Sequence, residues 1–140
     1  MPTPDSPHFA TWLMQSFVSL FLAILFLQSG MDKVMDWRGN LGYLQPHLAK
    51  SPLGGMVPTI LLILTCLEVS AGVVNGVGFL ELLVLGKPQI AFWGTALSAL
   101  TVTALFFGQR MAKEYHGAAV LVSYFLLTLV GIFLTSCHLR

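Results

Sequence analysis

Apolar residues run along this chain in long stretches separated by short polar segments. Asp, Glu, Lys and Arg are missing from residues 6–31, 51–67, 69–80, 88–109 and 117–139. A helix needs about 20 apolar residues to cross the hydrocarbon core of a bilayer. Joining the two stretches on either side of Glu68 predicts four transmembrane helices, at 11–31, 57–80, 89–109 and 118–137. None shows the polar outer face of a soluble amphipathic helix. We predict an all-α integral membrane fold, one four-transmembrane-helix bundle over residues 1–140.

The connection between the first two predicted helices is the longest. Apolar residues recur in it at helical spacing among polar ones: Trp37, Leu41, Leu44 and Leu48. This pattern predicts a short amphipathic segment over 34–50 at the membrane interface, with a break near Pro46. A solvated loop is the alternative, because Gly39 and Gly42 also weaken a helix.

The composition favours a membrane protein and excludes a nucleic-acid partner. Of the 140 residues, 56% are hydrophobic and 9% are charged, whereas soluble domains carry roughly 25% charged residues. The net charge is +1, without a basic run, so a nucleic-acid footprint is missing. The N-terminal segment lacks a basic region and a cleavage site, so we expect the first helix to stay in the mature protein.

Lys and Arg are distributed unevenly between the connections. The first and third connections carry five of them: Lys33, Arg38, Lys50, Arg110 and Lys113. Lys87 and Arg140 belong to the other side. Because positive charge concentrates in cytoplasmic connections, this predicts that both termini lie outside.

Each predicted helix has a stripe of small and polar residues, which is how helices associate in lipid. The stripes are Gln15, Ser19, Ala23 and Phe26, then Thr65, Glu68, Gly72, Asn75 and Phe79, then Thr95, Ser98, Thr101 and Leu105, and last Tyr124, Thr128, Gly131 and Thr135. We expect these stripes to face inward. Gly30, Gly72, Gly76 and Gly131 are the expected helix-packing positions, with Gly72 and Gly76 forming a small-xxx-small pair.

Glu68 lies near the middle of the second predicted helix. A carboxylate in the bilayer centre costs on the order of 3 kcal/mol even on permissive scales, so it usually has a partner or a function. Three interpretations are open. Glu68 is protonated and bonded to Gln, Ser or Thr of neighbouring helices, or it lines a polar cavity for a quinone head group, substrate or proton, or it pairs with Lys33. A depth difference of about 10–15 Å along the helix axes ranks the direct pair last.

Other polar residues gather near Glu68. Asn75 shares its helix face, and Gln28 and Lys33 lie at the mouth of the same bundle. We take Glu68, Asn75, Lys33 and Gln28 as a candidate intramembrane site for a quinone or proton contact, and assign no catalytic residue.

Metal and thiol chemistry lack a motif. His47 and His116 are too few and too poorly spaced for a metal site. Cys66 and Cys137 are predicted to lie roughly 15 Å apart in depth, too far for a disulfide. Cys66 is best explained as a small buried hydrophobe.

Two short motifs resemble the DoxX family of small four-helix membrane proteins. Ser29-Gly30-Met31-Asp32-Lys33 is similar to the Gly-x-x-Lys signature of that family. Glu68-Val69-Ser70-Ala71-Gly72, followed by Gly76-Val77-Gly78, is similar to its second-helix glutamate and downstream glycines. Residues 36–44 and 47–53 resemble a DoxX-like subgroup, so the resemblance covers about residues 21–133.

The resemblance implies four transmembrane helices, with Lys33 and Glu68 as motif residues. Family members include a small subunit associated with thiosulfate:quinone oxidoreduction and others found in membrane oxidoreductase assemblies. By that resemblance we expect an accessory or structural subunit of a quinone-linked respiratory complex in a bacterial inner (cytoplasmic) membrane. Its expected partners are the lipid bilayer and other integral membrane subunits, with the Thr-rich third helix as the docking face.

The chain has no sequence signature for a cofactor. Haem ligands, a flavin fold and paired cysteines are all missing, so we expect no cofactor bound through a sequence signature, consider quinone or lipid as candidate ligands, and expect no catalysis by this chain alone. The alternative is a small proton-coupled transporter that uses Glu68. Small multidrug exporters also have four helices and one membrane glutamate, but they are shorter and carry it in the first helix.

Overall fold

The computed structural model describes residues 3–52 and 54–136. In this part of the chain the elements are all helical, and no strand occurs. They are α1 (Phe9–Met35), α2 (Trp37–Leu48), the 3-10 helix η1 (Gly54–Met56), α3 (Val57–Val84), α4 (Gln89–Met111) and α5 (Tyr115–Ser136). The predicted all-α fold is confirmed.

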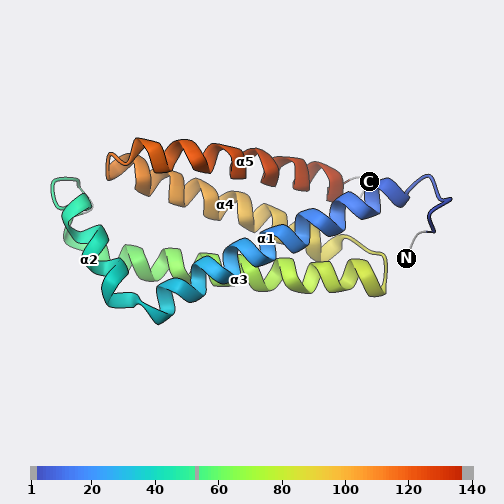
Figure 1. The fold of residues 1–140 in the computed structure, drawn as a ribbon, viewed down its shortest axis with the longest axis horizontal. Helices are drawn as coiled ribbons and strands as arrows, with labels where there is room; N and C mark the ends of the chain where they lie inside the picture. The colour runs from blue at the N-terminus through green and yellow to red at the C-terminus, as the bar shows by residue number, and fades with distance from the viewer. Residues whose placement is uncertain (1–2, 53, 137–140) are drawn as a thin grey trace.

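Four helices of the described chain are long and apolar enough to cross a membrane: α1, α3 together with η1, α4 and α5. The shortest, α5, has 22 residues, which gives about 33 Å against a hydrocarbon core of about 30 Å. Figure 1 shows the four helices as an antiparallel bundle with α2 folded across one end, the α2 end. The start of α1 and the α3–α4 connection lie at the opposite end. The predicted four-helix bundle is confirmed, and the chain is built as an integral membrane protein.

Several helices extend beyond their predicted ends. α1 continues four residues past the predicted end at 31, to Met35, and α3 continues past 80 to Val84. Hydropathy marks only the apolar part of a helix, whereas the backbone hydrogen bonds continue through polar residues such as Asp32 and Lys33. The predicted end of the last helix, at 137, lies outside the described residues.

The four helices turn their small and polar stripes inward, as predicted. Buried residues include Gln15, Ser19, Ala23 and Phe26 of α1, Thr65, Glu68, Gly72 and Asn75 of α3, Thr95, Ser98 and Thr101 of α4, and Thr128, Gly131 and Thr135 of α5. Phe79, Leu105 and Tyr124 are partly buried. Several hydroxyls bond within their own helix, as Thr101 Oγ1 does by donating to the Leu97 carbonyl at 2.8 Å. Such bonds satisfy buried hydroxyls without a partner helix.

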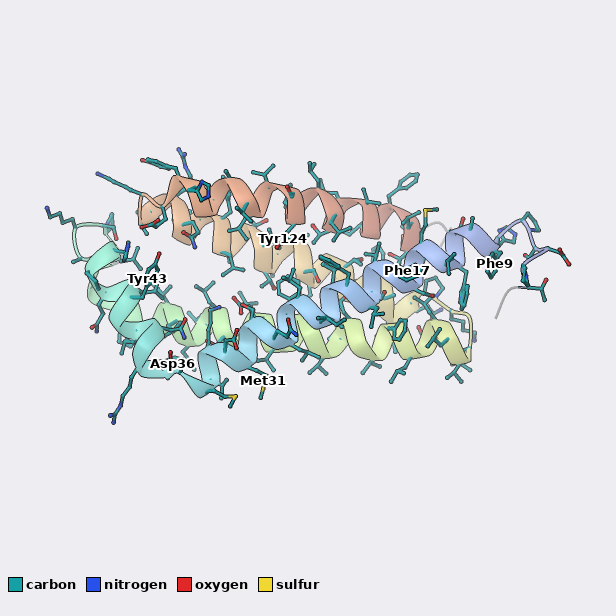
Figure 2. All side chains as sticks on the ribbon, viewed as in Figure 1. Phe9, Phe17, Met31, Asp36, Tyr43 and Tyr124 are labelled. Atoms are coloured by element: carbon teal, nitrogen blue, oxygen red, sulfur yellow. The ribbon has the colours of Figure 1, made fainter. Side chains whose placement is uncertain are left out.

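The outward faces are apolar, with large exposed side chains such as Phe17, Trp93 and Leu126. Figure 2 shows side chains projecting outward along the bundle, and it labels Phe17. Lipid is the natural environment of such surfaces. Of the three threonines of the third predicted helix, now α4, Thr95 and Thr101 are fully buried and serve packing within the bundle, whereas Thr103 is exposed. That this helix docks a partner subunit stays a prediction.

α2 is one continuous helix, so the predicted break near Pro46 is wrong. Pro46 lies two residues before the helix ends at Leu48, so it removes a single backbone donor close to the helix end. Leu48 is buried against the bundle, at 2% exposure, and His47 Nε2 lies 2.8 Å from Glu114 Oε1. These contacts hold the last turn in place.

Candidate functional site

An ion pair is buried between α1 and α3. Lys33 Nζ lies 3.0 Å from Glu68 Oε2, with the Glu68 side chain fully buried and that of Lys33 17% exposed. Lys33 also donates a hydrogen bond to Ser29 Oγ at 3.0 Å, one turn earlier on α1. The direct pair, ranked last from the sequence, is therefore the arrangement that forms. Within the described chain, Glu68 has no hydrogen bond to a Gln, Ser or Thr.

Two glycines bring α1 and α3 together beside this pair. A Cβ on Gly30 would lie 2.7 Å from Val69 Cγ2, and one on Gly72 would lie 2.7 Å from Leu27 Cγ. Both approaches are closer than real side chains allow, so the helices can pack this tightly only with glycine at these positions. Because Glu68 precedes Val69 and Lys33 follows Gly30 by three residues, the contact brings the two charged residues within reach.

Lys33 reaches Glu68, against the expected difference in depth, because α1 and α3 do not end at the same level. Met35 ends α1 five residues, about 7.5 Å, beyond the Gly30–Val69 contact. Val57 begins α3 twelve residues, about 18 Å, from the same contact. α3 therefore extends about 10 Å further toward the α2 end than α1 does. Lys33 therefore lies closer in depth to Glu68 than it would if the two helices ended at the same level, and α2 packs against α3.

The ion pair keeps unused hydrogen-bonding capacity. Glu68 Oε1 is buried and has no hydrogen-bond partner within the described residues. A lysine ammonium has three donors, and Lys33 uses two of them in the bonds to Ser29 and Glu68 that the described chain provides. An unsatisfied buried polar atom costs about 1–3 kcal/mol. Oε1 therefore has unused acceptor capacity, and Nζ has one unused donor on a residue that lines a cavity.

Lys33 also lines a cavity of about 160 Å³ beneath α2. Its apolar walls are Leu44, Leu48, Ile60, Leu64 and Leu105, and its polar lining includes Asn40, Tyr43, Gln109 and Glu114. Small apolar spaces with a few polar groups are typical of ligand sites. The buried pair thus adjoins a space near the α2 end through the lysine.

A contact between α2 and the α4–α5 turn borders this cavity. His47 Nδ1 lies 2.6 Å from the Tyr43 carbonyl, and Nε2 lies 2.8 Å from Glu114 Oε1. Glu114 immediately precedes α5, and Tyr43 and Glu114 both line the cavity. The His47–Glu114 contact therefore fixes α2 above the space that Lys33 borders.

Asn75 forms a separate polar centre between α3 and α4. Its Nδ2 donates to the Ala71 carbonyl at 2.7 Å and to Ser98 Oγ at 2.7 Å, and lies 3.2 Å from the Gly94 carbonyl. Its Oδ1 is buried without a partner in the described chain. Asn75 thus ties α3 to α4, and the structure does not bring it to the ion pair.

Gln28 does not join the candidate site either. It is exposed on α1, because five residues separate it from Lys33 and place it about 140° around the helix. Among the predicted packing glycines, Gly131 lies tightly against Thr95 and Val18, whereas a Cβ on Gly76 would meet only Ala23 Cβ at 4.0 Å.

Sequence reasoning missed two contacts that hold α3 against its neighbours. A Cβ on Gly78 would lie 2.7 Å from the backbone of Ala91 on α4. Trp12 near the start of α1 is buried, and its Nε1 donates to the Leu82 carbonyl of α3 at 2.8 Å. The signal for Gly78 was its helical spacing from Gly72 and Asn75; nothing in the sequence indicates the acceptor of Trp12.

The interpretation of Cys66 does not hold. Cys66 is exposed on α3, so its interpretation as a buried hydrophobe is wrong, and Cys137 lies outside the described residues. The described chain contains no group of three or more His, Cys, Asp or Glu side chains that could hold a metal ion.

These features define a class: a four-helix membrane bundle with a buried lysine–glutamate pair beneath an additional short helix. Comparisons of the chain with models of protein families, with curated proteins and with solved structures find no match. The DoxX resemblance therefore stays a prediction that rests on the motifs around Lys33 and Glu68.

Proposed function

We propose that this protein is a non-catalytic accessory subunit of a quinone-linked redox complex in a bacterial inner membrane, and that the Lys33–Glu68 pair contacts the head group of the quinone. The observation that carries the proposal is the buried ion pair with its unpartnered Glu68 Oε1. Intramembrane charges are expensive and mark functional sites by default.

The chemistry of the pair suits both redox forms of a quinone. A quinone carbonyl accepts a hydrogen bond, which Lys33 Nζ can donate, and a quinol hydroxyl donates one, which Glu68 Oε1 can accept. The adjoining cavity of about 160 Å³ is smaller than the roughly 300 Å³ of a drug-sized site. It therefore suits a single ring, and the isoprenoid tail would remain in lipid.

The hydrogen-bonding groups and the apolar wall of the cavity support the accessory role. In this proposal a partner subunit carries the redox centre, and this chain positions the quinone head group near it.

Quinone retention tests the site. The full chain, reconstituted in nanodiscs with a short-chain quinone, should retain it, and Lys33→Met and Glu68→Gln should each reduce retention about tenfold, the value of one hydrogen bond of about 1.4 kcal/mol. Lys87→Met, at the opposite end, is the control and should retain quinone as the wild type does. Equal retention in all four proteins would remove the quinone contact from the proposal.

The subunit role is tested separately, by affinity purification in mild detergent followed by mass spectrometry. Stoichiometric recovery of haem, iron–sulfur or flavin subunits is the expected result. A chain that always purifies alone would contradict the accessory role, whatever its quinone affinity.

One observation favours proton-coupled transport as a second candidate. Three buried polar atoms lack partners within the described residues: Ser19 Oγ on α1, and Glu68 Oε1 and Asn75 Oδ1 on α3. Unpartnered buried groups are places where water or a substrate binds. A proton-driven flux into proteoliposomes that Glu68→Gln abolishes would favour this function over the accessory role.

A further inference from the structure

A second pocket lies at the α2 end, between the end of α2 and the α4–α5 turn. Its volume is about 340 Å³, and its lining shares no residue with the cavity beside Lys33. Three cationic side chains line it: Lys50, which follows α2, and Arg110 and Lys113, from the end of α4 and the turn after it. His47, Ser51 and Tyr115 also contribute to the lining. Figure 2 shows long, nitrogen-tipped side chains gathered at this end of the bundle.

The charged side chains that line this pocket in the described chain are all cationic, and no Asp or Glu is among them. The adjacent carboxylate, Glu114, lies outside the lining and contacts His47 Nε2 at 2.8 Å. Arg110 lies over the Tyr115 ring, with its Cζ 4.9 Å from the ring centroid, which orients the guanidinium beside the pocket. Three cationic side chains thus line one pocket that an anion could enter.

The α4–α5 turn places Lys113 in a strained backbone conformation. Lys113 has φ 60°, in the left-handed region, and Gly86 takes the same conformation, φ 69°, in the α3–α4 connection. Glycine adopts this conformation freely, whereas a residue with a Cβ is strained there. Strain of this kind gathers at functional sites. The turn at the opposite end uses glycine, and the turn beside the pocket uses a lysine.

We propose that the pocket lined by Lys50, Arg110 and Lys113 binds the phosphate of an anionic phospholipid. The ends of membrane-spanning helices lie at the depth of the lipid head groups, where basic pockets recognise phosphate. The planar guanidinium of Arg110 can bind two phosphate oxygens at once, and the two lysines add point charges. The proposal is independent of the quinone contact, because the two sites have different linings.

Native mass spectrometry of the full chain tests this proposal, with phosphatidylglycerol as the anionic lipid and phosphatidylcholine as the neutral one. The wild type should retain phosphatidylglycerol at least tenfold better. Each of Lys50→Gln, Arg110→Gln and Lys113→Gln should weaken this retention about fivefold, the effect of one cation near a membrane surface. Arg38→Gln, also at the α2 end but outside the pocket, is the matched control and should change nothing.

Lys113→Gly separates function from folding. It removes the charge and relieves the left-handed strain, so the variant should unfold at a higher temperature while retaining about fivefold less phosphatidylglycerol. Unchanged retention in the triple variant Lys50→Gln/Arg110→Gln/Lys113→Gln would overturn the proposal. An equal loss in Arg38→Gln would also overturn it, since binding would then be a diffuse charge effect. Displacement of the lipid by millimolar inorganic phosphate would assign the pocket to a soluble anion and overturn the lipid assignment.

Discussion

Removing Lys33 should destabilise the bundle far more than neutralising Glu68. Lys33→Met keeps most of the side-chain length but leaves a fully buried carboxylate without its cation. Breaking a buried ion pair from one side costs about 3–5 kcal/mol. Because Lys33 is 17% exposed, we expect the lower end, about 3 kcal/mol.

Glu68→Gln leaves a different residue behind. The amide oxygen can still accept the hydrogen bond from Lys33 Nζ, now 3.0 Å from Oε2, and the lysine can reorient toward the α2 end. We expect a loss of about 1 kcal/mol, the value of one weakened hydrogen bond. The double variant Lys33→Met/Glu68→Gln has no unpaired charge and should lose less than Lys33→Met alone.

Unfolding in mixed micelles of mild detergent and SDS measures all four proteins under one condition. The coupling energy from this double-mutant cycle should be at least about 1.5 kcal/mol, well above the error between independent sites. A Lys33→Met variant within 0.5 kcal/mol of the wild type, or additive effects in the double variant, would refute the view that this pair is a coupled buried ion pair.

Three further predictions concern helix packing and use the same unfolding measurement. Gly78→Ala should cost about 1–3 kcal/mol of stability, because the added Cβ would lie 2.7 Å from the α4 backbone. Gly76→Ala is the control and should change stability by less than about 1 kcal/mol, because the nearest atom is 4.0 Å away. Equal effects of the two substitutions would contradict the packing. Asn75→Ala should cost about 1–2 kcal/mol by removing hydrogen bonds to α4, and a neutral result would show that Asn75 does not tie the helices. Trp12→Phe should cost about 1 kcal/mol through the lost bond to the Leu82 carbonyl, and a gain in stability would contradict that bond.

The fold was largely predictable because its rules are local. Membrane spans follow from runs of apolar residues, and the inward faces follow from the spacing of small and polar residues such as Thr65, Ser98 and Thr128. Errors arose where tertiary contacts override a local preference. Pro46 weakens a helix by itself, yet the burial of Leu48 and the contact of His47 keep α2 continuous.

The residues of the ion pair were identified from sequence, but not their pairing. Hydropathy gives the position of Glu68 along α3 and of Lys33 along α1, and it says nothing about how far one helix slides along the other. The lengths of the helices invite the assumption that their ends are level. The structure replaces that assumption with an offset of about 10 Å.

The register between α1 and α3 explains the pair completely. Gly30 contacts Val69, Leu27 contacts Gly72, and Ala23 lies nearest to Gly76. Each step back along α1 is therefore matched by an equal step forward along α3, as antiparallel helices require. Continuing this register the other way puts Lys33 level with residue 66, two residues or about 3 Å from Glu68 along the axis. One helix–helix contact would have sufficed to predict the pair, so glycines that permit only one close approach determine where the charges meet.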